Sequence, residues 1–173
     1  LAGIEVLALR VSFTGDLGWE VHCKSKDQTA LYTALVETAK EFGAGPVGSR
    51  ALMSMRLEKG YGSWSREYSP EYWPHEQGME RLCKLDKDFL NKGALEKVLA
   101  QDAREQMVLL QLDEAAISAS NADASGGEPI FKDGEGVGRV TSGTYGYTVG
   151  MSLALAMVKG VRPGDEVDVM VLG

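Results

Sequence analysis

The chain has 173 residues, of which 44% are hydrophobic and 25% are charged, and its formal net charge is −7. This apolar content is typical of a folded domain rather than a disordered chain. The negative charge argues against nucleic acid or an anionic membrane as a main partner. No apolar run approaches the roughly 20 residues of a membrane-spanning helix. Two cysteines, Cys23 and Cys83, are too few for a disulfide framework, so we expect a reducing, cytoplasmic environment.

The first predicted elements are two strands. Residues 6–13 are rich in β-branched and bulky side chains, and residues 19–23 alternate apolar with polar side chains, which is the period of a strand. Gly15 and Gly18 lie between the two runs. We therefore predict a tight, glycine-containing connection between the strands.

A helix is predicted to follow the second strand. Ser25 and Gln28 have the spacing of a capping box, in which Ser25 is the N-cap. Apolar residues then recur on one face as far as Phe42, and Gly43 ends the helix.

Two further helices are predicted at about residues 49–58 and 91–101. The inward face of the first should consist of Leu52, Met53 and Met55. Asn91 opens the second, and Asn tolerates a left-handed backbone conformation better than most residues.

After residue 103 the pattern changes to short strands, at residues 106–112, 137–142, 151–158 and 166–172. Asp133-Gly134 is a hairpin turn signal, and a second turn is expected at residues 163–165. Strands at this spacing favour a small antiparallel β-barrel or sandwich. We therefore predict an α+β chain with two parts, residues 1–103 and residues 104–173.

Two motif-like strings do not support the sites that they suggest. His75-Glu76 begins like a zinc-protease helix, but Met79 stands where the second His must lie, and no metal site is expected. The glycine-rich residues 134–138 lead into a strand, whereas a dinucleotide fingerprint leads into a helix. We interpret this second string as a hairpin.

Glu20 is a single acid within an otherwise apolar, strand-like run. It has two interpretations. It is either an exposed strand acid, or a fixed acceptor whose two oxygens take paired hydrogen bonds from a planar ligand. Local sequence does not choose between them.

Four ordered blocks resemble the glycine-cleavage T-protein (aminomethyltransferase) superfamily. The first is Phe-Thr-Gly-Asp-Leu-Gly-Trp-Glu at residues 13–20, and the others lie at residues 51–60, 84–95 and 137–156. The resemblance implies the C-terminal part of a folate-binding α/β region over residues 1–103, followed by a C-terminal β-barrel. It also implies tetrahydrofolate-dependent transfer of an aminomethyl or methylene group. The expected partners are folate, a small amine-derived one-carbon donor and a lipoyl carrier protein.

The resemblance also implies roles for individual residues. Glu20 would accept hydrogen bonds from the pterin amide and amino groups, and Phe13 would lie against the pterin plane; the alternative for Phe13 is a core aromatic. Trp64 would line the site. The family's main catalytic residue is an Asp from a segment N-terminal to this chain, so no catalytic residue is assigned here.

One departure concerns the acidic tail of folate. The family pattern has an Arg where this chain has Leu52. Tail binding would then need another cation, and Arg56 and Arg66 are the candidates. The alternative for Arg56 is an ion pair with Glu58 or another acid.

We consider three kinds of parent protein. The first is a stand-alone aminomethyltransferase. The second is an FAD-dependent dimethylglycine or sarcosine dehydrogenase, whose flavin lies in an N-terminal domain, because residues 57–61 and 145–152 resemble the folate-binding tail of these enzymes. A non-catalytic folate-binding assembly or repair factor is disfavoured, because Lys59-Gly60-Tyr61 lacks that branch's Cys. The chain starts at Leu1 without a Met or a basic, signal-like run, so we expect a fragment of a longer protein.

Overall fold

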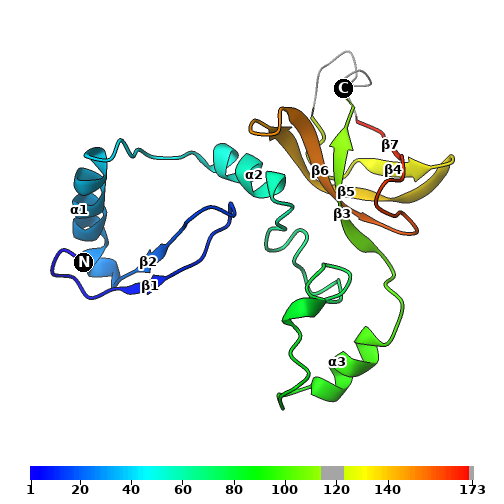
Figure 1. Cartoon of the computed structure of the whole chain (residues 1–173), viewed down its shortest axis with the longest axis horizontal. Coiled ribbons are helices and arrows are strands. Elements are labelled where there is room, and N and C mark those ends of the chain that lie inside the picture. Colours follow the sequence, from blue (N-terminus) through cyan, green and yellow to red (C-terminus); the bar gives the residue numbers. More distant parts are fainter. Residues whose placement is uncertain (114–122, 172–173) are drawn as a thin grey trace.

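The computed structural model describes residues 1–113 and 123–171. Figure 1 shows a hairpin and a helix at one end of an elongated molecule, a five-stranded sheet at the other, and a connecting region between them. The fold is mixed α+β with antiparallel sheets. No helix within the described residues is long and apolar enough to cross a membrane.

The hairpin is short. Strand β1 (Leu7–Leu9) pairs antiparallel with β2 (Glu20–His22), and Leu9 lies opposite Glu20. The predicted pair of strands is therefore present, but each strand is only three residues long. The connection between them contains Gly15 in the left-handed region, at φ +79°.

Helix α1 (Gln28–Lys40) follows a 3-10 turn, η1 (Ser25–Asp27). The prediction that Ser25 caps the helix is wrong, because Ser25 lies inside the 3-10 turn and the N-cap of α1 is Asp27. The α-helix therefore starts one turn later, and the Asp27 side chain makes no capping hydrogen bond.

Helix α2 (Ser49–Glu58) begins and ends as predicted. Its predicted inward face is wrong at Leu52 and Met53, which are each 38% exposed. The helix instead packs its C-terminal half on the sheet, where Leu57 is buried against Leu155.

The region between α2 and the sheet contains a second 3-10 turn and a third helix, η2 (Glu80–Leu82) and α3 (Lys92–Leu99). Asn91 precedes α3 with φ +65° and ψ +19°. The predicted left-handed conformation at Asn91 is thus confirmed.

The large sheet is antiparallel throughout, with the strand order β3-β6-β5-β4-β7. Its strands are β3 (Gln106–Leu112), β4 (Pro129–Lys132), β5 (Glu135–Gly146), β6 (Met151–Val158) and β7 (Asp168–Val169). The predicted strands at 106–112 and 151–158 are confirmed, and that at 137–142 forms part of β5. The last predicted strand is reduced to β7, and residue 172 lies outside the described residues.

The described strands do not close into a barrel. Strands β3 and β7 form the two edges of the sheet, and no pairing joins them within the described residues. Because β7 supplies only two paired residues, it contributes little length for closure. Within the described residues the predicted antiparallel strands are therefore present, but they form an open five-stranded sheet rather than a closed barrel.

The turn between β4 and β5 confirms the hairpin interpretation of the glycine-rich string. Asp133 and Gly134 have φ of +54° and +81°, the two positive values that a tight two-residue hairpin turn requires. Further along, a Cβ on Gly138 would lie 2.1 Å from the carbonyl oxygen of Met157. Glycine at this position allows β5 and β6 to approach closely.

Strand β6 forms the centre of the core and is buried along most of its length. On one face Ala154, Ala156 and Val158 pack with Val140 and Ile130. On the other face Leu153 and Leu155 pack against Leu57 of α2. Burial on both faces explains why the sequence of β6 is a continuous apolar run.

Candidate functional site

Glu20 stands at the first position of β2 and faces solvent. Its side chain is 62% exposed, and its Oε2 lies 3.2 Å from Nε2 of His22, two residues further along the same face of the strand. No other side chain hydrogen-bonds its carboxylate within the described residues. The carboxylate therefore keeps capacity to accept further N–H donors.

The connection between the strands lies beside the end of α2. A Cβ on Gly15 would lie 2.9 Å from side-chain carbons of Lys59, so the two segments are in contact there. Phe13 belongs to this connection and is 37% exposed. Its ring is accessible and is not part of either core cluster.

Trp64 is 81% exposed on the segment that follows α2. Its backbone is held by a bridge to Tyr68, and the chain turns back there because the Tyr68 N–H donates to the Ser63 carbonyl oxygen at 3.1 Å. In the described part of the chain, no hydrogen bond or ring contact joins Trp64 to Phe13 or Glu20.

Arg56 lies in the interior rather than on the surface. Its side chain is 2% exposed, and Nη1 lies 3.5 Å from Oε2 of Glu67, which is fully buried. The same nitrogen donates to the carbonyl oxygen of Tyr61 at 2.9 Å. This is the ion pair considered as the alternative for Arg56, with Glu67 as the acid.

Glu67 connects α2, the following segment and the large sheet. Its carboxylate accepts hydrogen bonds from the Ser63 N–H at 2.8 Å and from the Ser142 hydroxyl of β5 at 2.5 Å. Burial raises the pKa of Glu67, but the hydrogen bonds from Ser142 and Ser63 and the charge of Arg56 outweigh it and hold the pKa below its usual value. The carboxylate therefore stays ionised inside the protein.

A second carboxylate joins the connecting region to the sheet. Glu76 is buried and accepts from Nε and Nη2 of Arg104, at 2.8 and 2.7 Å. The Arg104 guanidinium also lies 4.2 Å from the ring centre of Trp73. Hydrogen bonding from Arg104 is the main cause that lowers the pKa of Glu76 to about 2.

The described residues thus place the Glu20 carboxylate exposed on the β1–β2 hairpin, and the Glu67 and Glu76 carboxylates buried, where each holds segments together. Glu67 and Glu76 were missed by sequence reasoning, since their partners lie far along the chain. No group of three or more His, Cys, Asp or Glu side chains that could hold a metal ion occurs within residues 1–113 and 123–171.

Comparisons with known proteins bear on both parts of the chain. The family model described as "GCVT N-terminal domain" matches residues 1–87, and the model described as "Glycine cleavage T-protein C-terminal barrel domain" matches residues 106–173. Together they cover most of the sequence.

Two kinds of curated relatives are similar to the chain. Mitochondrial dimethylglycine dehydrogenase of Homo sapiens is 36% identical over 100% of the chain and 20% of its own length. An aminomethyltransferase of Thermotoga petrophila is 34% identical over 98% of the chain and 45% of its own length. The chain therefore spans less than half the length of either relative.

A solved structure has the same fold. The chain matches the glycine cleavage system aminomethyltransferase T of Bartonella henselae with a TM-score of 0.70 and 22% identity. The match covers 87% of this chain and 41% of that one.

Proposed function

Because the chain belongs to the glycine cleavage T-protein family, we propose that it is the tetrahydrofolate-binding, C-terminal part of a one-carbon transferase of the aminomethyltransferase type. The observation that carries this proposal is the exposed Glu20 carboxylate on β2, with His22 as its hydrogen-bond partner. Its place in the chain is that of the pterin-binding acid in the family's motif.

The chemistry of the hairpin fits a pterin. A pterin edge presents an amide N–H and an amino group side by side, and a carboxylate accepts both through its two oxygens. The exposed ring of Phe13, in the connection before β2, supplies an apolar face for the flat ring system. Trp64 is proposed to line the same site from the segment after α2.

Arg56 is proposed to act indirectly. Its guanidinium is buried and already engaged with Glu67 and the Tyr61 carbonyl. It therefore fixes the conformation of the segment that carries Trp64. Tetrahydrofolate would supply the nitrogens that accept the one-carbon unit, and this chain would bind and orient it.

The parent enzyme has two candidates. The alternative to a stand-alone aminomethyltransferase is the tail of an FAD-dependent dimethylglycine dehydrogenase, with the flavin held outside this chain. The observation that favours this alternative is the 36% identity to the human dehydrogenase over the whole chain. Because that relative is named as mitochondrial, the cytoplasmic location stays a prediction, as do the lipoyl carrier protein and the division near residue 103.

The test is calorimetric titration of tetrahydrofolate into the protein that contains this chain. Glu20→Gln should weaken binding by about 1.5–3 kcal/mol, the range of a lost hydrogen bond to a charged group. The matched control is Glu5→Gln, because Glu5 is also an exposed acid of the N-terminal part, with a side chain 90% exposed. Equal affinity of the Glu20 variant and the unmodified protein would remove Glu20 from the folate site.

A further inference from the structure

Lys59 stands at the C-cap of α2, and its side chain reaches the hairpin. A Cβ on Gly15 would lie 2.9–3.0 Å from Cγ, Cδ and Cε of Lys59, so the aliphatic stem of Lys59 crosses the Gly15 backbone. Figure 1 shows the connection between β1 and β2 approaching the end of α2. Lys59 therefore brings a positive charge to the connection that carries Phe13.

This contact depends on glycine at position 15. Gly15 adopts a φ of +79°, in the left-handed region that favours glycine. It also lacks the Cβ that would collide with the Lys59 stem. A long lysine stem commonly lies against another segment while its ammonium stays in water. Packing against Gly15 therefore holds the Lys59 ammonium near the connection.

The Lys59 ammonium is available to a ligand. Lys59 is exposed, and within the described residues its ammonium makes no hydrogen bond or ion pair, either with Asp16 beside Gly15 or with another acid. The preceding residue, Glu58, instead accepts the Thr148 N–H through Oε1 at 2.7 Å. The ammonium therefore keeps its three N–H donors for an external anion.

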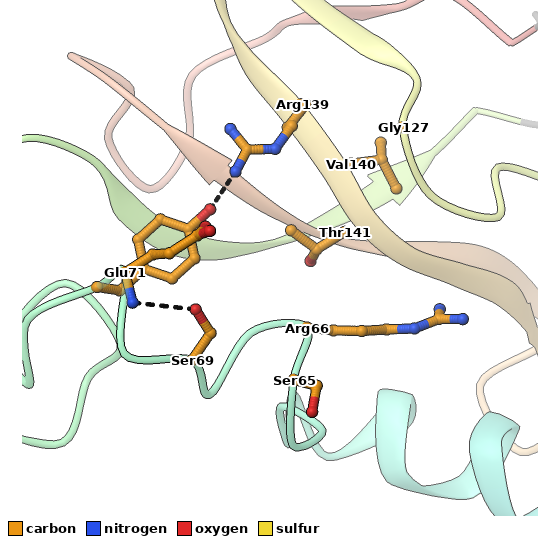
Figure 2. Close-up of a pocket in the computed structure, with 9 residues that line it drawn as sticks. Ser65, Arg66, Ser69, Glu71, Gly127, Arg139, Val140 and Thr141 are labelled. Atoms are coloured by element: carbon orange, nitrogen blue, oxygen red, sulfur yellow. Dashed lines mark hydrogen bonds between the residues drawn. The ribbon is translucent and has the colours of Figure 1, made fainter.

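Other cations are less well placed for the acidic tail of folate. Arg56 is buried, and its guanidinium is engaged in the interior. Figure 2 shows Arg66 on the wall of a pocket between β5 and the segment that follows α2, and no residue of the hairpin or its connection lines that pocket. The Arg10 guanidinium lies 5.9 Å from the centroid of the Trp19 ring. Lys59, in contrast, combines contact with the connection and an unpaired ammonium.

The spacing along the connection suits an elongated ligand. Gly15 is two residues after Phe13 and five residues before Glu20, so the Lys59 contact lies within about 18 Å of Glu20. Folate is also elongated, with the pterin at one end and the carboxylates of its glutamate tail at the other. We propose, on the basis of the function proposed above, that Lys59 binds the tail carboxylates when Glu20 binds the pterin. Lys59 would thus replace the charge that is missing at Leu52.

The experiment compares two ligands by calorimetric titration into the protein that contains this chain. One is tetrahydrofolate, and the other is 6-methyltetrahydropterin, which keeps the pterin but has no carboxylate. Lys59→Met keeps most of the stem that packs on Gly15 and removes the charge. It should weaken tetrahydrofolate binding about fivefold, as expected for an exposed ion pair, and this loss should shrink at high salt. Binding of 6-methyltetrahydropterin should be unchanged, and Lys59→Arg should restore tetrahydrofolate binding.

Two controls separate this proposal from the function proposed above. Lys26→Met removes another exposed lysine and should leave both affinities unchanged, whereas Glu20→Gln should weaken the binding of both ligands. The role of Lys59 is overturned if Lys59→Met binds tetrahydrofolate as tightly as the unmodified protein, or if it weakens both ligands equally. If the unmodified protein binds neither ligand, the proposed function fails together with the role of Lys59.

Discussion

Arg56 and Glu67 form a charged pair with almost no contact with solvent, at 2% and 0% side-chain exposure. Removing two charges from water is costly, and here the cost is offset by the Tyr61 carbonyl and by the Ser63 and Ser142 donors. The pair therefore contributes little net stability as a whole. Loss of one partner alone would leave a buried charge without compensation.

Replacing Arg56 alone should be strongly destabilising. We expect Arg56→Met to lower the free energy of unfolding by about 3–5 kcal/mol, measured by urea denaturation, because Glu67 stays buried without its cation. The double variant Arg56→Met, Glu67→Gln should recover part of this loss. Lys40→Met is the matched control in an exposed ion pair with Glu37, where about 1 kcal/mol or less is expected. A loss that small for Arg56→Met would contradict a structural role for the pair.

Sequence patterns could not identify this cluster. Glu67 and Ser142 are 75 residues apart, and neither lies in a local motif that requires a buried partner. Glu20 could be identified from the sequence because its signal is local, in the glycine turn and the alternating strand around it. The sequence did not decide whether its side chain is exposed, and the structure places it on the solvent-facing side of β2.

The segment before η2 is attached to the start of β3 mainly through Glu76. Glu76 accepts from Arg104 through both oxygens, and the Trp73 N–H donates to it at 2.7 Å. The backbone continues this attachment, because the Met107 N–H donates to the Glu76 carbonyl oxygen at 2.8 Å. The connecting region is therefore held to the sheet by charge as well as by backbone hydrogen bonds.

This attachment predicts a dependence of stability on pH. The pKa of Glu76 is about 2 in the folded protein, against a usual value of 4.5. Its stabilising contribution should be complete above about pH 4.5 and should be lost as the pH falls towards 2. Allowing for the half-exposed Arg104, we expect Glu76→Gln to cost about 2–3 kcal/mol at pH 7 and progressively less in acid.

The measurement is thermal or urea denaturation of both proteins between pH 7 and pH 2. Because other carboxylates also titrate in this range, the informative quantity is the difference between the two proteins at each pH. Glu80→Gln replaces an exposed carboxylate nearby and serves as the control. A difference that is constant with pH would show that Glu76 makes no such contribution.

Elements with strong local signals were predicted well. Strands β3 and β6 are nearly continuous apolar runs, and α2 lies between glycines, at Gly48 and Gly60. The Ser25 cap failed for a local reason, the 3-10 turn before α1, whereas the inward face of α2 failed because it depends on distant partners. Leu52 and Met53 fit an inward helix face by spacing, but the sheet that α2 contacts reaches only its C-terminal half, at Ser54, Arg56 and Leu57.

The two ends of the molecule differ in how well their backbone is protected (Figure 1). Strand β6 is paired on both sides and buried. Strands β1 and β2 pair only with each other among the described residues, and all three residues of β1 are exposed. A hairpin of this length is marginally stable by itself.

Hydrogen–deuterium exchange on the 173-residue chain should reveal this difference. We expect the amides of Ala8 and Val21 to exchange within the earliest time points. Those of Ala154 and Ala156 should exchange only on global unfolding, because they lie in the core. Similar protection at both ends would show that the hairpin is stabilised by contacts other than those described.

The buried carboxylates of Glu67 and Glu76 restrict how chimeric proteins could be made from this chain and its relatives. Ser142 and Arg104 follow the division that we predict near residue 103, yet both donate to acids that precede it, Glu67 and Glu76. A chimera that grafted another relative's residues 104–173 onto this N-terminal part would need a hydroxyl and a guanidinium at these two places. Without them, each graft would leave a negative charge enclosed at the junction. Compatible junctions could therefore be chosen by matching these two pairs before overall sequence identity is considered.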